Sequence, residues 1–260
     1  MQRLDLVRER QELILQRLSE LIQRVLQAEA SQVQPPSSKA EPAAISAEAS
    51  DVPHAEASEL QHRLRCELKS RGVTSFRFKR VPSDYYDRPL EGRQQMLAAS
   101  SIEQLCKSIV LENVLHEPNP LTCTAACHSK HFLVLVQYAA KLHTEKLKRC
   151  LVKLSEGTLR AKHVNLRLAP EATSGQLTGF GHNAVTPVGM RTPLPIIMSH
   201  HIQNLQPGWF WMGGGEVDLK LGLPTAAFIS AYQPLVLDFL GSRMGRKDDL
   251  PLCLACRRFL

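Results

Sequence analysis

Apolar residues at the start of the chain recur at alternating spacings of three and four, the pattern of a coiled-coil helix. The seam has one polar member and consists of Leu4, Val7, Gln11, Ile14, Leu18, Leu21, Val25 and Ala28. A helix of this length is marginal by itself in water, so it needs a packing partner. We expect residues 1–28 to form an amphipathic helix. It packs on its own domain, on a second copy or on another protein, and the linker that follows favours a partner helix.

The pattern changes twice in the next sixty residues. Residues 29–57 are Ala, Ser, Pro and Glu with almost no large apolar side chain, which predicts a disordered linker. Ser58 then begins a helix, with Gln61 completing a capping box. Leucines at positions 60, 64 and 68 mark its buried face, and Gly72 is placed to end it.

Short apolar runs then mix irregularly with amphipathic segments. We expect strands over 73–81, 106–113, 131–138, 163–169, 193–199 and 209–215. We expect helices ending near Ala98, over 142–155 with leucines at 142, 147, 151 and 154 on one side, over 170–179 and over 223–232. This order predicts a mixed α/β (α+β) domain around one sheet over residues 58–240, followed by a basic flexible tail over 241–260.

Composition limits the classes of protein to consider. No apolar run approaches the ~20 residues of a membrane span, and the N-terminus lacks the apolar core of a secretory signal. The seven cysteines are an odd, scattered set, which fits a reducing compartment. We therefore expect a soluble cytoplasmic protein with no membrane partner.

Charge is unevenly distributed along the chain. Residues 1–57 carry six Lys/Arg and nine Asp/Glu, and the remaining chain carries 26 Lys/Arg and 16 Asp/Glu. A basic domain behind an acidic leader favours an anionic partner, nucleic acid first. The alternative is charge that serves solubility alone.

Two groups of Cys and His residues have the side chains of zinc ligands. Cys123, Cys127, His128 and His131 lie in a loop between two predicted strands, at a spacing that matches no standard finger, and Cys253 with Cys256 forms a lone CxxC in the tail. We predict no metal at either, and metal analysis of the purified protein decides. Trp209 and Trp211, two apart on one strand, could stack a terminal adenine, but core packing is the favoured interpretation.

The glycine-rich stretch 177–189, LTGFGHNAVTPVG, and the run Gly213-Gly214-Gly215 are the main candidates for chemistry. Glycine lets a ligand approach the backbone closely, and Pro187 fixes the turn after Thr186. Such a loop can present backbone N–H groups to an oxygen-rich ligand. By local composition alone, a plain connector is the favoured interpretation.

Four stretches resemble the YbaK/prolyl-tRNA synthetase-associated family of trans-acting aminoacyl-tRNA deacylases and editing insertions. They are CKSIVLEN (106–113), LRLAPEATSGQLTGF (166–180), HNAVTPVGM (182–190) and FWMGGGEVDLKLGLP (210–224), in the family's order. FKRVPSDYYDRPLEGR (78–93) is most similar to the eukaryotic stand-alone members. One position departs from the family: Asn183 stands four before Pro187 where the family has Gly, and Asn tolerates the left-handed conformation.

The resemblance, which covers about residues 58–232, implies a fold, an activity and a site. The fold is a single mixed, barrel-like sheet flanked by short helices, and the activity is hydrolysis of mischarged tRNA, of the tRNA-Pro class, without a cofactor. Lys107 is implied as the group that stabilises the oxyanion or holds the terminal ribose. The pocket wall is implied to consist of Asn183, Ala184, Val185, Thr186, Pro187, Gly189, Gly213, Gly214 and Gly215. His182 adjoins this wall, but the family pattern does not require it.

Two other functions compete with this one. The first is a non-catalytic tRNA-binding or assembly module that retains an editing-like fold, and the second is a metal-dependent hydrolase built on the Cys/His loop. In each case the helix of residues 4–28 is expected to dock the domain to a partner such as an aminoacyl-tRNA synthetase or a multi-synthetase complex, which raises its effective concentration near fresh product.

Overall fold

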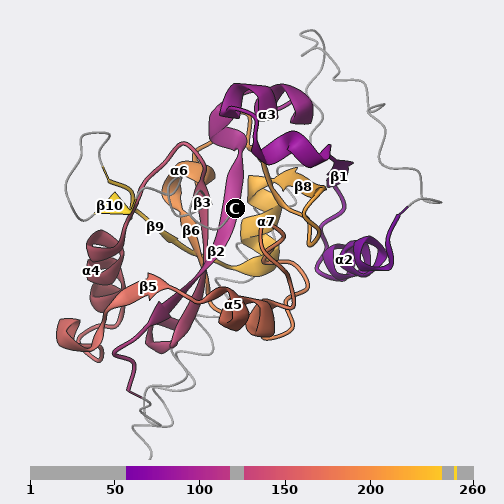
Figure 1. Ribbon diagram of the computed structural model, residues 1–260. Helices are drawn as coiled ribbons and strands as arrows, with labels where there is room; N and C mark the ends of the chain where they lie inside the picture. The colour runs from indigo at the N-terminus through magenta and orange to yellow at the C-terminus, as the bar shows by residue number, and fades with distance from the viewer. Residues whose placement is uncertain (1–56, 118–125, 242–248, 251–260) are drawn as a thin grey trace, which may run out of the picture. The chain divides into compact units, whose positions relative to one another are not determined.

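The computed structural model describes residues 57–117, 126–241 and 249–250 (Figure 1). The predicted coiled-coil helix, the linker up to residue 56 and most of the tail lie outside these residues, so those predictions stay predictions. The chain divides into two units, Met1–Ala49 and Ser50–Leu260, and all described residues belong to the second.

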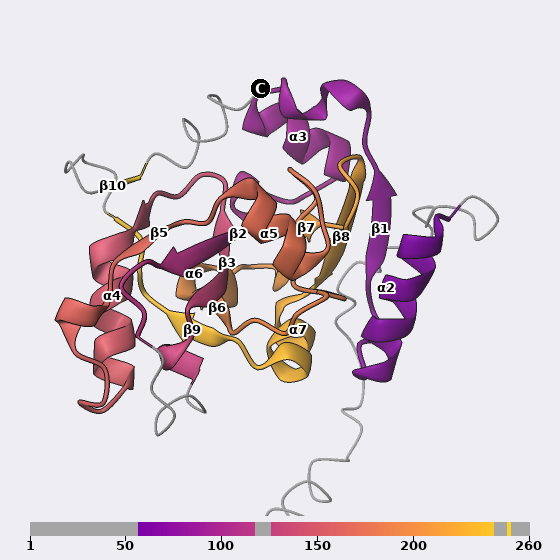
Figure 2. The ribbon, with the colours of Figure 1, turned by 60° about the horizontal axis from the view of Figure 1, so that its bottom comes forward.

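The first described helix, α2 (Glu59–Ser70), begins and ends where the sequence predicts, but the capping box is only half formed, because the buried Gln61 side chain makes no hydrogen bond among the described residues. The Ser58 side chain accepts a hydrogen bond from the Gln61 amide at 3.1 Å. At the other end Gly72 is left-handed (φ 78°), and the Val73 amide reaches back to the Leu68 carbonyl at 2.9 Å. The left-handed glycine and this hydrogen bond together form a Schellman motif, which ends the helix. The helix lies beside β1 (Arg77–Arg80) in both ribbon views (Figures 1 and 2).

A five-stranded mixed sheet forms the centre of the unit, in the order β5-β2-β3-β6-β9. β2 (Cys106–Asn113) is antiparallel to both β3 (His131–Gln137) and β5 (Leu166–Leu168). β6 (Ile196–Ser199) is parallel to β3 and to β9 (Leu235–Leu237). The mixed α/β class predicted from the sequence is confirmed.

A second sheet is antiparallel and has the order β1-β8-β7. Its strands β7 (Trp209–Gly213) and β8 (Leu219–Pro224) form a hairpin, and β8 also pairs with β1. A bridge between Leu105 and Trp211 links this sheet to the start of β2. The sequence did not predict β8 as a strand, and the preceding strand ends at Gly213 rather than continuing to 215.

Helices and short elements fill the connections. The segment before β2 holds η2 (Ser83–Tyr86), α3 (Leu90–Leu97) and η3 (Ile102–Gln104). Beyond it are η4 (Ala126–His128), η5 (Ala161–His163), α4 (Thr144–Leu154), α5 (Glu171–Thr178), α6 (His200–Gln203) and α7 (Thr225–Tyr232). In Figure 1, α4 lies on one side of β2 and β3, and α7, β8 and β1 lie on the other.

The helix predicted over 142–155 begins two residues late. Leu142 and His143 form the short strand β4, which pairs with β10 (Asp249–Leu250). His143 then caps α4 through its ring nitrogen, which accepts from the Lys146 amide at 3.2 Å. Leu147 and Leu151 are buried as expected, whereas Leu154 is 46% exposed because it falls in the last turn, beyond the sheet.

Two large apolar clusters form the core of this unit. One joins α2, α7, β7 and β8 with one face of the central strands, and includes Leu64, Phe78 and Phe210. The other lies under α4 and includes Leu111, Leu147 and Phe239. In the part of the chain that the structure describes, none of the helices combines the length and the hydropathy that crossing a membrane requires.

Candidate functional site

A cavity of about 350 Å³ opens where β2 meets the two loops that flank α5. Its lining comes from residues 107–110 of β2, residues 168–171 with Ser174, residues 180–183 with Val185, and Tyr86, Tyr138 and Gly213. These segments are far apart in the sequence. The cavity is at the lower end of the ~300–1,000 Å³ range of small-molecule sites.

Lys107 lies in the wall of this cavity. It is the second residue of β2, where Val136 of β3 is its partner in the ladder. The residue is only 8% exposed, and its ammonium lies 5.3 Å from the centre of the Tyr138 ring. A solvated lysine at the start of a strand would be far more accessible, so Lys107 is not an ordinary exposed residue of a strand end.

Asn183 faces the same cavity from the other side of the fold. Its backbone is left-handed, with φ 60°, as the glycine-to-asparagine departure led us to expect. Its carbonyl accepts a hydrogen bond from the Tyr86 hydroxyl at 2.8 Å. The turn is therefore formed without glycine, and a tyrosine from a distant segment holds it.

Val185 and Gly213 complete this part of the lining. A Cβ atom on Gly213 would lie 2.6 Å from the Val185 carbonyl oxygen, so only glycine fits where β7 passes the turn. The two glycine-containing stretches that the sequence singled out are therefore in direct contact. Their approach also explains why the run begins with glycine at the end of a strand.

The other residues predicted for the pocket wall lie behind its surface. They are Ala184, Thr186, Pro187, Gly189, Gly214 and Gly215, none of which lines the cavity. Several of their polar groups are used within the fold. The Gly215 amide donates to the Ala184 carbonyl at 3.1 Å, the Gly214 amide donates to Leu219, and the Thr186 hydroxyl accepts from the Val188 amide at 3.4 Å. Their role in this structure is to shape the turn.

Lys220 of β8 is a further charged group at the site, and the sequence did not identify it. It is 4% exposed, and its ammonium donates to the Tyr86 hydroxyl at 2.7 Å and to the Val217 carbonyl at 2.8 Å. Burial lowers the pKa of Lys220 to about 8. In the sequence, only its position inside the apolar run LKLGL (219–223) marks this lysine, and the sequence did not predict that run as a strand.

Cations and aromatic rings alternate around Lys220 and Tyr86. The Lys220 ammonium lies 4.9 Å from the ring centre of Tyr85 and 4.5 Å from that of Tyr86. The Arg93 guanidinium lies 5.4–5.6 Å from the ring centres of Tyr85, Tyr86 and Tyr138. Aromatic faces attract cations, so these rings partly replace the water that burial removes.

Glu171 and His182 also line the cavity, beside Asn183. The His182 Nδ1 atom lies 3.9 Å from a Glu171 carboxylate oxygen, and both side chains are partly exposed. The family pattern gave no role to His182, yet its position lets it meet a ligand. The cavity thus has a lysine on one side and a carboxylate with an imidazole on another.

The two tryptophans do not reach this cavity. Trp211 is 5% exposed and belongs to an apolar cluster with Tyr85 and Leu105. Trp209 packs against it edge to face, with ring centres 6.2 Å apart. The favoured interpretation, core packing, agrees with these contacts.

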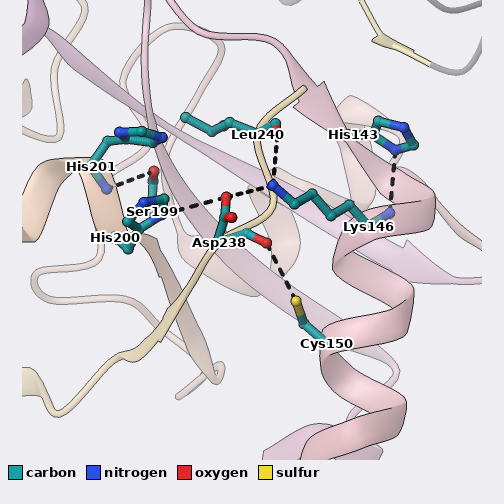
Figure 3. Close-up of polar contacts among 8 residues, drawn as sticks. All are labelled: His143, Lys146, Cys150, Ser199, His200, His201, Asp238 and Leu240. Atoms are coloured by element: carbon teal, nitrogen blue, oxygen red, sulfur yellow. Dashed lines mark hydrogen bonds and ion pairs between the residues drawn. The ribbon is translucent and has the colours of Figure 1, made fainter. Parts of the chain in front are cut away.

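A second polar cluster lies beyond β6, between α6 and α4 (Figure 3). Ligand-type atoms of His200, His201 and Asp238 lie within 4.8 Å of one another. The carboxylate of Asp238 is 2.7 Å from the Lys146 ammonium and 3.5 Å from His200 Nδ1. Burial alone would raise the pKa of Asp238, but the Lys146 hydrogen bond and the neighbouring positive charges outweigh it and lower that pKa. Lys146 already supplies the positive charge that a bound cation would bring, so the cluster is an ion-pair network that ties α4 to the segment after β9.

The Cys/His loop is only partly within the described residues, because Cys123 lies outside them. Cys127 is buried against the core under α4. The His128 ring contacts the Thr158 hydroxyl at 2.8 Å, and His131 Nε2 lies 3.9 Å from Glu112. Within the described ranges, these three side chains do not gather as a group of metal ligands. Cys253 and Cys256 lie outside the described residues.

Solved structures with the same fold are known. One is a candidate trans-editing enzyme for prolyl-tRNA synthetase, with 22% identity and a TM-score of 0.54 over 72% of this chain and 99% of that one. A scaffold protein from computational epitope grafting matches at 19% identity and a TM-score of 0.53 over the same shares. A hypothetical protein matches at 16% identity and a TM-score of 0.50 over 69% of this chain and 99% of that one. At these identities the likeness shows the fold alone: this chain has the mixed α/β fold of those proteins.

The sequence matches no protein-family profile, and no curated protein sequence matches it.

Proposed function

We propose that this protein is a YbaK-family trans-editing deacylase that hydrolyses the ester bond of mischarged aminoacyl-tRNA. The observation that carries the proposal is the convergence of Lys107, the Asn183 turn and Gly213 on one cavity. These are three of the segments on which the family resemblance rests. By that resemblance the substrate belongs to the tRNA-Pro class.

Hydrolysis of the ester requires little from the protein beyond positioning the substrate and the attacking water. Water attacks the ester carbonyl carbon, an oxyanion develops, and the bond between the acyl carbon and the ribose oxygen breaks. The ribose oxygen gains a proton, and the free amino acid leaves. Because the ester is already activated, one well-placed donor to the oxyanion contributes a large part of the rate, typically ~3–4 kcal/mol.

Lys107 is assigned to the carbonyl and terminal-ribose side of the substrate. It is the cation in the cavity lining, and its burial strengthens its interaction with a developing negative charge. Glu171 and His182 are assigned to the other side. There the carboxylate of Glu171 can bind the α-ammonium group of the aminoacyl moiety, and His182 can orient it.

The size of the cavity and the charge of the chain support the same assignment. A volume of about 350 Å³ accommodates an aminoacyl group with part of its ribose, so the rest of the tRNA must lie outside the cavity. Residues after 57 carry ten more positive than negative charges, which suits a polyanionic substrate. The helix of residues 4–28 is proposed to bring the domain to a synthetase or a multi-synthetase complex.

Release of free amino acid from a panel of mischarged tRNAs tests the proposal. We expect hydrolysis of at least one member by the wild-type protein. We expect a loss of roughly 100-fold or more in Lys107→Ala, in line with the removal of one oxyanion donor.

Two further variants make this result specific. Lys107→Met keeps most of the side-chain volume and separates the loss of charge from the loss of packing. Lys141→Ala removes an exposed lysine just after β3 and should hydrolyse at the wild-type rate. If Lys107→Ala, with its circular-dichroism spectrum unchanged, turned over substrate like wild type, the assignment of Lys107 would be wrong.

A non-catalytic tRNA-binding or assembly module is the second candidate. One observation favours it: the amides of Ala184, Gly214 and Gly215 already have acceptors within the fold, which reduces the backbone donors left for an oxyanion. Such a module would bind uncharged and mischarged tRNA with similar affinity and release no amino acid from any member of the panel.

A further inference from the structure

We infer that Lys220 is a positioning residue for the candidate site: it holds the Tyr86 hydroxyl against the backbone of Asn183 and so fixes the turn that forms one wall of the cavity. Its effect on catalysis rests on the proposed deacylase function. Its effect on the turn does not.

Three hydrogen-bonded groups connect β8 to the cavity. The Lys220 ammonium donates to the Tyr86 oxygen at 2.7 Å, and the Tyr86 hydroxyl donates to the Asn183 carbonyl at 2.8 Å. Tyr86 and Asn183 both line the cavity, whereas Lys220 does not. Lys220 therefore acts on a ligand only through Tyr86 and the turn.

The surroundings of Lys220 are unusual for a structural lysine. The side chain is 4% exposed, and none of the ion pairs among the described residues includes it. A phenol, a backbone carbonyl and two aromatic faces take the place of a counter-ion. Burying an ammonium in this way is unfavourable, and at a cavity such an arrangement points to a functional role.

The protonation state of Lys220 decides which way the Tyr86 proton points. A charged Lys220 can only donate, so Tyr86 must give its own proton to Asn183. A neutral Lys220 can instead accept a hydrogen bond from the Tyr86 hydroxyl, which leaves the Asn183 carbonyl without its donor. Because burial lowers the pKa of Lys220 to about 8, both states occur near neutral pH.

Other titratable and charged groups face Lys220 from every element around it. Asp218 precedes it in the turn before β8 and favours its charge, whereas Arg93 of α3 opposes it. Lys79 of β1 is its partner in the ladder. The remaining groups near it are Tyr85, Tyr86, Cys106 and Tyr138.

Amide hydrogen exchange of the full-length protein tests the positioning role without any substrate. We expect Lys220→Met and Tyr86→Phe each to lower the protection factors of residues 183–185 by roughly tenfold, since each breaks the same connection. The double variant should lose no more than the larger single loss. In wild type this protection should fall between pH 7 and pH 9. Lys220→Arg, which stays charged, should keep it at both pH values.

Kinetics on the tRNA that wild type hydrolyses supply the second measurement. A misplaced wall lowers kcat, with a loss of up to ~100-fold, more than it raises KM. Lys141→Met is the matched control. It makes the same substitution at an exposed lysine that neither lines the cavity nor lies among the groups around Lys220, and it should leave both the protection of residues 183–185 and the kinetics unchanged.

Each outcome decides between the positioning role and its alternatives. Unchanged protection at residues 183–185 in Lys220→Met and Tyr86→Phe would overturn the inference, whatever the kinetics. Protection lost across the whole unit, with a lower melting temperature, would mark Lys220 as a general structural residue and overturn it too. If wild type releases no amino acid, the proposed function fails, and the exchange measurement still decides the role of Lys220.

Discussion

Asn183 combines a backbone requirement with a place in the cavity wall. Its φ of 60° lies in the left-handed region, where most side chains are strained and glycine is not. Lys220 is a comparable case, because its ammonium group lies in a buried environment that disfavours the charged form. Both residues are held by Tyr86, so the site depends on a few groups in unfavourable states that the surrounding structure stabilises.

Substitutions at Asn183 separate the backbone from the side chain. We expect Asn183→Ala to lower the free energy of unfolding by about 1 kcal/mol, because alanine disfavours the left-handed region. Asn183→Gly should stay close to wild type in both unfolding and amino-acid release. Urea denaturation with the release assay measures both. Equal stability of the two variants would contradict the backbone explanation, and a loss of activity in Asn183→Gly at wild-type stability would give the role to the side chain.

The buried charge of Lys220 predicts a pH-dependent stability. The pKa of Lys220 is about 8 when folded and 10.5 by its ordinary value, so between these pH values the unfolded chain binds more protons. Stability therefore rises with pH across this window, and the full penalty is present below pH 8. At about 1.4 kcal/mol per pKa unit the net penalty is on the order of 3 kcal/mol.

Lys220→Met should consequently be more stable than wild type at pH 7, and the difference should shrink towards pH 10. Guanidinium unfolding at both pH values measures it. If Lys220→Met is more stable than wild type but less protected at residues 183–185, Lys220 serves function at a cost in stability. A variant that is less stable at pH 7 and equally so at pH 10 would contradict the linkage.

At the scale of elements, β2 and β3 followed from their sequences and β8 did not. CKSIVLEN and HFLVLVQ are β-branched, apolar runs that were predicted as strands, and they pair over seven positions. β8 contains Lys220 and Gly222, two residues that disfavour a strand assignment. In the structure both fit, because Trp211 covers Gly222 so closely that a Cβ would lie 2.8 Å from its ring, and Tyr86 accepts from Lys220.

Elements are also joined by polar contacts whose strength depends on pH. The Asp238 carboxylate connects α4, through Lys146, with α6, through His200 (Figure 3). Its pKa is lowered, so its contribution is present above the ordinary pKa and is lost as the pH falls through the folded value. The Asp238 side chain is largely exposed, so its ion pairs should contribute within the range of ~0.2–1 kcal/mol for surface ion pairs.

We expect Asp238→Asn to lower the free energy of unfolding by up to ~1 kcal/mol at pH 7. The difference from wild type should shrink as the pH falls below the ordinary pKa of 3.8 and through the lowered folded value, because the wild-type carboxylate then becomes protonated. Thermal unfolding from pH 7 into this acid range measures this, with Asp87→Asn as an exposed control that has no ion pair among the described residues. A difference that stays constant through the acid range would show that packing, rather than charge, explains the effect.

At the scale of the whole molecule, we propose that the predicted helix and linker serve docking and that the domain after them carries the chemistry. Among the described residues, none before Tyr86 lines the cavity. Recruitment through residues 4–28 would raise the local concentration of the domain without changing the site.

Seam substitutions test this division in the full-length protein. Ile14→Asp with Leu18→Asp places charges in the seam and should abolish co-purification with a synthetase complex, while the rate on free mischarged tRNA stays within about twofold of wild type. Gln16→Asp with Gln23→Asp makes matching changes on the opposite face and should retain co-purification. Equal retention by both pairs would argue against docking through the seam.

The sequence by itself determined the elements whose signals are local. The Ser58 cap, the Gly72 stop, strands β2 and β3 and helix α5 depend on neighbouring residues, so a pattern of a few residues predicts them. It also led to Lys107, Asn183, Val185 and Gly213 as residues of one site, through motifs that the chain shares with a family.

Tertiary structure decided the rest, because it depends on residues far apart in the sequence. It separated the four predicted residues that line the cavity from the six that support it. It also brought Tyr86, Tyr138, Glu171 and Lys220 to the site, although no local pattern connects them. A hydrogen bond between residues 134 positions apart, such as that of Lys220 to Tyr86, leaves no periodicity in the sequence, because only the folded sheet brings the two groups together.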